Sequence, residues 1–158
     1  MNKGERISEF VRELEGTAMA AEGGALADHP YYRAFFHCWN ERRYYEAHDV
    51  LEQVWLGKAI ASDDMRYFKG LIQAAGAFVH LQKQFEHPTH PKHGRRLGPA
   101  VRLFRLAEAN LEPLGPHRHG LDLVKFRKML NSYLNAIVES DQQRNPWSPE
   151  SAPKVSLE

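Results

Sequence analysis

The sequence has one cysteine, no long apolar run and no excess of charge of one sign. The single Cys38 excludes an internal disulfide and is typical of a reducing compartment, so we expect a cytoplasmic protein. The longest mostly apolar stretch, 70–81, is interrupted by Gln73 and His80 and is too short to cross a bilayer. Charges spread through residues 5–13 interrupt the apolar core that a secretory signal needs.

The balance of charge argues against a nucleic-acid or anionic-membrane partner. Lys plus Arg total 21 and Asp plus Glu total 20, which leaves a net charge of +1. Residues 1–85 carry 10 basic and 12 acidic residues, so residues 86–158 carry the remaining 11 and 8. The basic excess of the second part includes Arg95, Arg96, Arg102 and Arg105. We interpret these arginines as a solvated helix face, with an anionic small molecule as the alternative ligand.

Several sequence motifs of enzymes are missing as well. No Glu is followed by His three residues later, a spacing that the di-iron carboxylate bundle needs twice. The His-Glu-x-x-His zinc motif, the Gly-x-Ser-x-Gly motif and a glycine-rich phosphate loop are also absent. Cys38 adjoins Trp39 in an aromatic stretch and is interpreted as a packing residue. Whether the protein is an enzyme stays open, and any metal site would be a non-standard one.

What the sequence does contain is helical periodicity along most of its 158 residues. We expect a first helix around the stripe 7–14, and a second helix that begins near Pro30. Four more are expected over residues 44–56, 65–85, 97–111 and 121–140. The prediction is an all-α fold, a compact single-domain helical bundle of about five to six helices over residues 1–141. Three prolines between residues 146 and 153 predict a proline-rich C-terminal tail over 142–158.

The third and fourth predicted helices carry the polar residues of greatest interest. His48 and Glu52 form an i,i+4 pair at the edge of an apolar face, whereas Asp49 is expected to point into solvent. The fourth helix is apolar nearly all round, as a central helix would be, yet Gln73 and His80 share one stripe of it. Small residues beside that stripe, Gly70, Gly76 and Ala77, would let another helix approach closely.

Two segments resemble the signature of the domain of unknown function 309 family. Residues 36–55 read FHCWNERRYYEAHDVLEQVW and match its Tyr-x-Glu-Ala-His-Glu-x-Leu-Glu-x-x-Trp pattern. Residues 68–75 read FKGLIQAA, followed by His80, and look like its Gly-Leu-Ile-Gln helix. The resemblance extends over 31–111, the motif core, and implies a small all-helical fold with no established activity. Asp49 replaces the family's usual Glu, and Arg43 stands where an acidic or small residue often caps the helix.

Because a buried polar side chain without a partner is costly, Gln73 and His80 need partners, and we expect His48 and Glu52 to supply them. The predicted site is thus a polar pocket between the third and fourth helices, formed by Glu46, His48, Glu52, Gln73 and His80.

One hypothesis is a non-catalytic ligand-binding or assembly module whose partner is an unknown small molecule or protein, and a homo-oligomer stays open. The alternative is a metal-dependent hydrolase with a divalent ion on His48, Glu52 and His80 and with Glu46 as a further ligand or acceptor. A loop containing His87, His90 and His93 is interpreted as solvated rather than as a metal site.

Overall fold

The computed structural model describes residues 26–56 and 62–158, and the side chains of 54–56 are not among those described. The helix expected around 7–14 lies outside these ranges. Within them the chain forms five α-helices, which confirms the all-α prediction: α2 (Pro30–Asn40), α3 (Tyr44–Leu56), α4 (Ser62–Glu86), α5 (Leu97–Leu111) and α6 (Leu123–Glu139). Two 3₁₀ turns, η1 (Leu26–Asp28) and η2 (Glu112–Leu114), precede α2 and follow α5. None of the described helices combines the length and apolarity needed to cross a membrane.

Local chemistry accounts for the helix starts. The His29 side chain caps α2 by accepting a hydrogen bond from the amide of Tyr31 at 3.2 Å, and Pro30 occupies the first helical position. Asp122 caps α6 in the same way through the amide of Lys125 at 3.0 Å. Helix α4 begins three residues earlier than the periodicity indicated, so Asp64 lies in its first turn. Acidic residues there face the positive end of the helix dipole.

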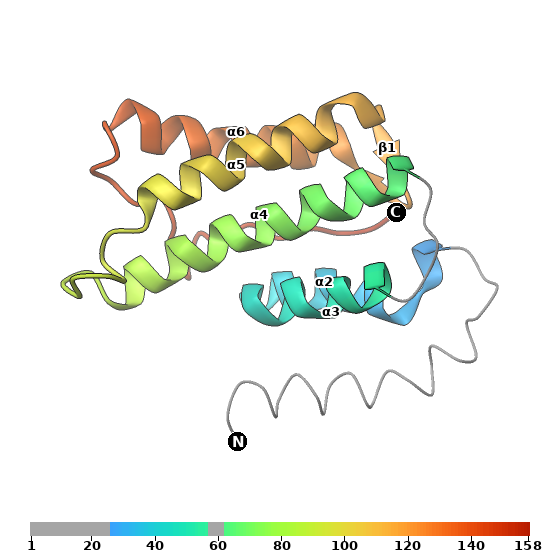
Figure 1. Ribbon diagram of the computed structural model, residues 1–158, viewed down its shortest axis with the longest axis horizontal. Coiled ribbons are helices and arrows are strands. Elements are labelled where there is room, and N and C mark those ends of the chain that lie inside the picture. The colour runs from blue at the N-terminus through green and yellow to red at the C-terminus, as the bar shows by residue number, and fades with distance from the viewer. Residues whose placement is uncertain (1–25, 57–61) are drawn as a thin grey trace, which may run out of the picture.

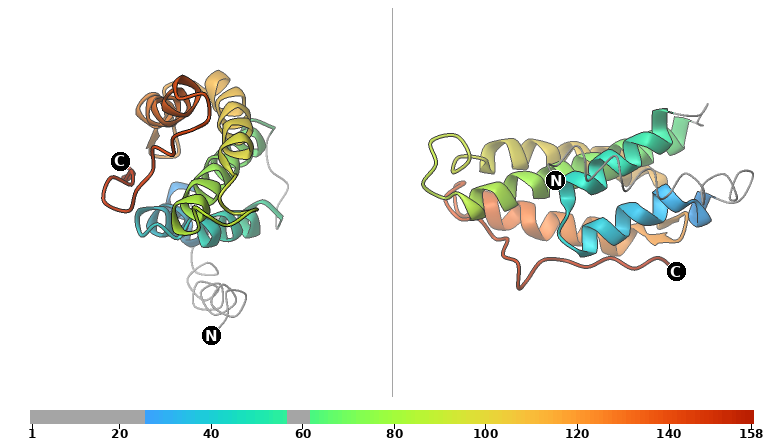
Figure 2. Two further views of the ribbon diagram at one scale, coloured as in Figure 1. Left: turned by 90° about the vertical axis from the view of Figure 1, so that its left-hand side faces the viewer. Right: turned by 90° about the horizontal axis from the view of Figure 1, so that it is seen from below.

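Helix α4 is the central element of the bundle. Helices α5 and α6 lie on one side of it and the α2–α3 pair lies on the other (Figure 1). Seen from the end, α4 and α5 run side by side with α6 next to α5 (Figure 2). The aromatic ring of Phe78 shows why this arrangement holds together. Its centroid lies 4.8 Å from Trp39 of α2, 5.3 Å from Tyr44 of α3, 5.5 Å from Phe104 of α5 and 5.0 Å from Tyr133 of α6. One α4 side chain therefore contacts every other described α-helix.

A short hairpin connects η2 to α6, where the sequence indicated a loop up to residue 120 and a helix from residue 121. Strands β1 (His117–Arg118) and β2 (Leu121–Asp122) pair antiparallel, with Arg118 opposite Leu121. The two turn residues, His119 and Gly120, have φ values of 47° and 81°. Two successive positive φ angles define the tight turn that suits the twist of a hairpin. Strands of two residues are too short to show alternation, so periodicity could not predict them.

Residues 142–158 contain no helix or strand, yet they do not extend into solvent. They run back along the bundle as an extended segment (Figures 1 and 2). Trp147 is only 2% exposed and its indole nitrogen donates a hydrogen bond to the hydroxyl of Tyr44 at 3.1 Å. Hydrogen bonds from Trp39 and Asn40 to backbone oxygens hold the chain near Pro153 and Val155. We call residues 145–158 the strap, since they fasten α2 and α3 to α6.

Candidate anion-binding site

The predicted polar pocket is only partly assembled, and its members on α3 stay together. The Nδ1 atom of His48 lies 3.1 Å from a carboxylate oxygen of Asp49 and 3.9 Å from one of Glu52. Asp49, expected in solvent, has a side chain only 26% exposed and supplies the shorter contact. Glu46 is buried and pairs with Arg43 at 3.9 Å. Arg43 thus compensates a buried carboxylate at the start of α3, although it cannot cap the helix as an acidic residue does.

The polar residues of α4 face a different helix from the one predicted. Gln73 accepts a hydrogen bond from the side-chain amide of Asn110 on α5 at 2.7 Å. A methyl group at Gly70 would lie 2.7 Å from Leu111, and one at Gly76 would lie 3.1 Å from Leu103. The small-residue stripe therefore does admit a neighbouring helix at close range, as expected, and that helix is α5.

His80 also finds its partner toward α5. Its Nδ1 atom lies 3.0 Å from Nη1 of Arg96, the residue just before that helix. In the described part of the chain no hydrogen bond or ion pair joins His80 or Gln73 to His48 or Glu52. The structure thus brings His48 and Glu52 together and gives Gln73 and His80 separate partners.

Arg96 is the centre of a cationic cluster at this end of the bundle. Its Nε donates to Nδ1 of His93 at 3.1 Å, and Nη2 contacts the same nitrogen. Because a guanidinium can only donate, both His80 and His93 act as acceptors through Nδ1, which is the neutral imidazole form. The backbone amide of Arg96 donates to the side chain of Gln84 at 2.7 Å. The loop histidine therefore positions the arginine instead of lying free in solvent.

Electrostatics around Arg96 are strongly positive. Burial, followed by the charges of Arg96, Lys83 and Arg102, lowers the pKa of His80 to about 4. Burial and the same Arg96 charge also lower the pKa of His93 and that of Lys83. A proton is disfavoured on each of these groups because positive charge is already concentrated there.

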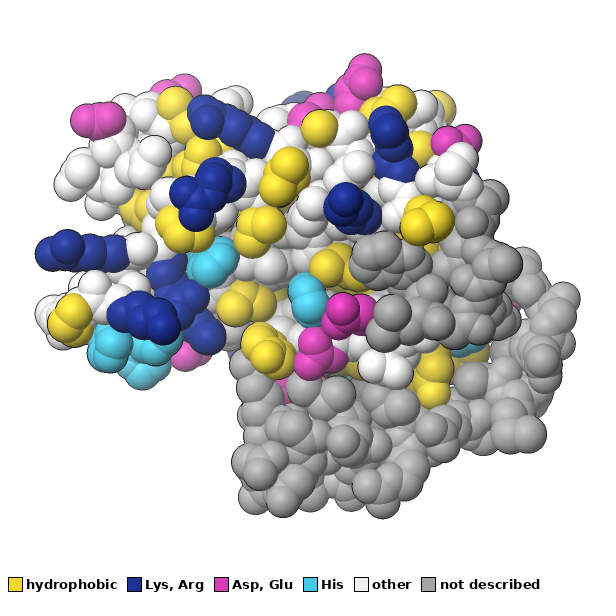
Figure 3. All heavy atoms as spheres, viewed as in Figure 1, with side chains coloured by type: hydrophobic (Ala, Val, Ile, Leu, Met, Phe, Trp, Pro, Cys, Tyr) yellow, Lys and Arg dark blue, Asp and Glu magenta, His cyan; other side chains and the backbone are white. Residues whose placement is uncertain are grey.

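Within residues 26–56 and 62–158 no carboxylate forms an ion pair with these cations, although the charge of Glu86 favours the protonated form of Lys83. Among the described residues, none of the ion pairs within 4 Å involves Lys83, Arg95, Arg96 or Arg102. Figure 3 shows Lys, Arg and His side chains gathered over one end of the molecule, with few acidic ones among them. We define Lys83, His80, His93 and Arg96 as the Arg96 cluster. Three of the five N–H donors of the guanidinium bind histidine nitrogen, so two remain for a ligand.

A cleft of about 490 Å³ lies at the start of α5, and none of the four residues of the Arg96 cluster lines it. It is lined by Gln84, Gly94, Arg95, Leu97, Gly98, Pro99, Gln142 and Gln143. The N-terminus of α5 has no side-chain cap, because Arg96 at the N-cap position makes no such hydrogen bond. Amides and one arginine thus surround a space beside the positive end of a 15-residue helix.

Potential metal ligands gather elsewhere in the described residues. His48, Asp49 and Glu52 form one group whose ligand atoms lie within 4.8 Å of one another, and His117, Asp122 and Glu158 form another. The predicted set of His48, Glu52 and His80 is not such a group, since Asp49 takes the place of His80. The loop residues His87, His90 and His93 are not one either, although the His90 and His93 rings are 4.5 Å apart. His90 Nδ1 accepts the amides of Lys92 and His93 and is occupied within the loop.

A second polar network, which the sequence did not reveal, fastens the hairpin to α4. One oxygen of Asp64 lies 2.8 Å from Nη1 of Arg118 and 2.7 Å from Nε2 of His119. Burial by itself raises the pKa of Asp64, but the hydrogen bonds from His119 and Arg118 outweigh it and lower the pKa. The hydroxyls of Tyr32 and Tyr67 are 2.6 Å apart beneath this network, and burial raises the pKa of both. These hydroxyls also donate to the backbone carbonyls of His119 and Arg118, so the contacts join the hairpin, α2 and α4 to one another, and we interpret the network as structural.

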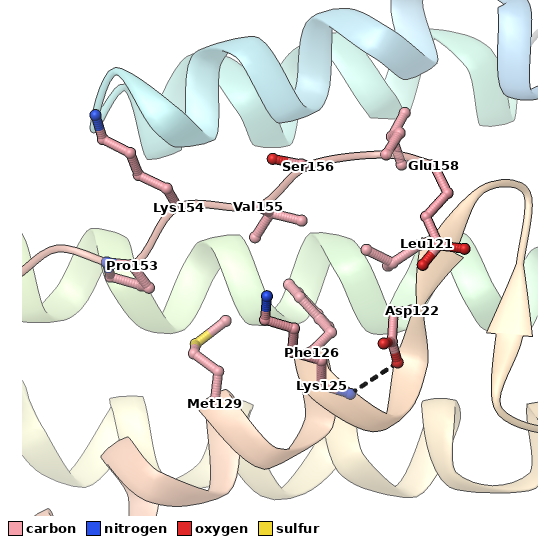
Figure 4. A pocket seen from close by; sticks show the side chains of 11 residues that line it. Leu121, Asp122, Lys125, Phe126, Met129, Pro153, Lys154, Val155, Ser156 and Glu158 are labelled. Atoms are coloured by element: carbon pink, nitrogen blue, oxygen red, sulfur yellow. Dashed lines mark hydrogen bonds between the residues drawn. The ribbon is translucent and has the colours of Figure 1, made fainter.

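The Cys38 thiol and a cavity beside the strap lie apart from these polar groups. Burial raises the pKa of the Cys38 thiol to about 11, which suits a packing residue and not a nucleophile. A cavity of about 380 Å³ lies between α6 and the strap, lined by Phe126 and Met129 on one side and Pro153 and Val155 on the other (Figure 4). Its existence depends on the position of the strap.

Residues 32–88 match the family described as Domain of unknown function (DUF309), which confirms the resemblance seen in the sequence. The matched region covers nearly all of α2, then α3 and α4, with the His48, Gln73 and His80 positions. The description of this family states no activity. No curated protein matches the chain. No solved structure matches it either.

Proposed function

We propose that the protein is a non-catalytic ligand-binding module that takes an oxyanion, a phosphate or carboxylate group, at the Arg96 cluster. The observation that carries this proposal is the guanidinium of Arg96, held between two neutral histidines and paired with no carboxylate of the described residues. Histidine acceptors orient the side chain without cancelling its charge. An oxyanion would supply the missing negative charge and accept the two remaining N–H donors in the planar geometry that arginine offers.

The surroundings favour a small anion over a polymer. The cluster lies around the α4–α5 connection, and the net charge of +1 is not the overall basic excess that is typical of nucleic-acid binding. We propose that an uncharged polar part of the same molecule reaches the cleft at the start of α5, which is lined by the side-chain amides of Gln84, Gln142 and Gln143. We place the protein in the cytoplasm in this proposal, because its one cysteine is buried and unpaired.

The test is calorimetric titration with inorganic phosphate and with citrate, at constant ionic strength and with chloride as the reference anion. Arg96→Gln removes the central charge, and Arg105→Gln is the matched control because it removes the same charge from an exposed position of α5. We expect saturable binding of at least one anion, weakened about tenfold or more by Arg96→Gln and little changed by Arg105→Gln. Equal weakening in both variants would show only general attraction, and would contradict the proposal.

A second candidate ligand is a divalent cation on α3. It is favoured by the group formed by His48, Asp49 and Glu52, which offers one imidazole and two carboxylates within a single turn. Elemental mass spectrometry of protein purified without added metal, beside His48→Ala, tests this candidate. Near-stoichiometric metal that is lost in the variant would support it and would justify a screen for hydrolase activity. Metal-free wild-type protein that takes up no zinc or manganese on dialysis would remove it.

A further inference from the structure

The strap is held mainly through its backbone. The side-chain amide of Asn40 donates to the carbonyl of Val155 and accepts from the amide of the same residue, both at 2.7 Å. The indole of Trp39 donates to the carbonyl of Pro153 at 3.1 Å, and the hydroxyl of Tyr133 donates to the carbonyl of Ser151 at 3.2 Å. At the end of the strap, the amide of Glu158 donates to the carbonyl of Gly120 at 2.8 Å. The side of the bundle that these residues form is therefore called the groove, and it holds the strap as an extended chain.

Two side chains fix the register of the strap in this groove. Trp147 is buried, and its ring lies 6.1 Å from that of Tyr44 and 5.5 Å from that of Phe85. Asn145 donates to the backbone carbonyl of Leu81 at 2.8 Å. All of these contacts join the strap to the body of the bundle, and none depends on which copy of the chain supplies the strap.

The turn that sends the strap back along its own bundle uses an unfavourable backbone. After α6 the amide of Gln142 donates to the carbonyl of Ile137 at 2.9 Å, and that of Asp141 donates to Val138 at 3.0 Å. This is the hydrogen-bond pattern of a Schellman cap, in which glycine normally follows the helix. Here Asp141 and Gln142 occupy the left-handed region with φ values of 54° and 59°. Residues with a Cβ atom adopt that region at a cost, and two in succession are uncommon.

The local sequence does not require this turn. Between Glu139 and the first following proline, Pro146, the chain reads SDQQRN and contains no glycine. Glutamine and arginine are good helix formers, so the segment is compatible with continuation of α6 by a further turn. We call residues 140–144 the hinge. The contacts of the strap therefore impose the change of chain direction at the hinge, and a helical hinge would not need the two left-handed residues.

We propose that the strap is exchangeable, and that two copies of this chain form a symmetric dimer by inserting each strap into the groove of the other. Both states make the same groove contacts, so these cancel between them. The free-energy difference between monomer and dimer then has two parts. Relief of the strained hinge in both copies favours the dimer, and the entropy lost when two copies associate favours the monomer. The occupant of the groove in this dimer is residues 145–158 of the second copy, a segment whose fit is already seen within one chain.

Two double variants of the full chain test the hinge. They differ from each other only by one methyl group at each of the two positions. Asp141→Gly/Gln142→Gly removes the penalty of the left-handed turn, whereas Asp141→Ala/Gln142→Ala keeps it and favours helix. Each protein is refolded at low and high concentration and its mass is measured by light scattering after size exclusion. We expect the dimer fraction to be highest for the alanine variant and lowest for the glycine variant, with association constants that differ by about a hundredfold or more.

A cysteine pair reports whether a dimer is exchanged. A Cβ atom at Gly120 would lie 3.7 Å from the Cβ of Leu157, a separation that suits a disulfide, and 3.2 Å from the carbonyl oxygen of Glu158. The φ of 81° at Gly120 makes this cysteine costly for the hairpin, so the variant is compared only with proteins that fold to the same extent. Gly120→Cys/Leu157→Cys in the alanine background should give covalent dimers from the dimer peak and internally closed monomers from the monomer peak. Leu157→Cys alone is the control, and circular dichroism checks that each variant folds.

Either of two results would overturn the proposal. The alanine variant could remain monomeric at every concentration and after refolding, which would show that the hinge does not open. Alternatively, its dimer peak could yield only internally closed monomers on a non-reducing gel, which would show that the copies associate through another face.

Discussion

His80 is expected to make the protein less stable in mild acid. Its pKa in the folded state is about 4, against 6.5 for an ordinary histidine. The unfolded chain therefore binds more protons than the folded chain between these values, and stability falls as the pH falls through this window. Above pH 6.5 His80 is neutral in both states and the free energy of unfolding keeps its full value. As the pH falls to about 4, the cost of protonating His80 in the folded state removes this contribution.

The size of the effect follows from the difference between the two pKa values. At about 1.4 kcal/mol per pH unit, a fully buried group would account for roughly 3 kcal/mol. The His80 ring is only half-buried and solvent screens part of the interaction, so we expect about 1–2 kcal/mol.

The assay is urea unfolding of wild type and His80→Asn at pH 7 and at pH 4.5. Asparagine keeps an acceptor for Arg96 but does not titrate, so every other titrating group cancels in the comparison. Wild type should lose about 1–2 kcal/mol more than the variant over this interval. Equal losses in the two proteins would refute the burial and charge argument for His80.

The same residue reports on the proposed ligand. Nuclear magnetic resonance of the His80 ring should show its pKa rise in Arg96→Gln, because one of the two largest causes of the depression is removed. A bound oxyanion should raise it in wild type for the same electrostatic reason. If phosphate binds by calorimetry and leaves this resonance unchanged, it binds away from the Arg96 cluster.

Three other predictions concern the packing. Gly70→Ala should cost about 1–3 kcal/mol, because its methyl group would lie 2.7 Å from Leu111; urea unfolding checks this, and a neutral result would mean that α5 moves freely. Phe78→Ala should cost about 3–5 kcal/mol, since the ring contacts four helices, and thermal unfolding should show it; a cost below about 1 kcal/mol would contradict its central role. Asp64→Ala should cost about 1–3 kcal/mol through the lost bonds to the hairpin, and hydrogen exchange should rise at His119; unchanged exchange would mean that the hairpin holds without this network.

The helical pattern predicted much of the architecture because its signals are local. The bounds of α3 (Tyr44–Leu56) and α5 (Leu97–Leu111) coincide with the predicted ranges. Proline and the capping position before it set the start of α2. The apolar circumference of α4 predicted its central place, which the contacts of Phe78 confirm.

The partners of polar side chains were harder to predict. Periodicity identified the stripe of α4 that contains Gln73 and His80, and the small residues beside it predicted a close neighbour. It did not say which helix that neighbour is, because a face of a helix carries no information about what lies opposite. The motif directed attention to His48, whereas the residues that meet His80 and Gln73 come from beside and within α5.

The sequence by itself determined the helices, the faces that they bury and the residues that need partners. All three follow from short-range spacing and from the cost of burying polar groups. Only the tertiary structure decided that Arg96 lies between two histidines, that Asp64 holds the hairpin and that Trp147 folds back onto Tyr44. These contacts join residues that are far apart in the chain or lie in loops, where no periodic signal exists and the packing of the whole bundle selects the partner.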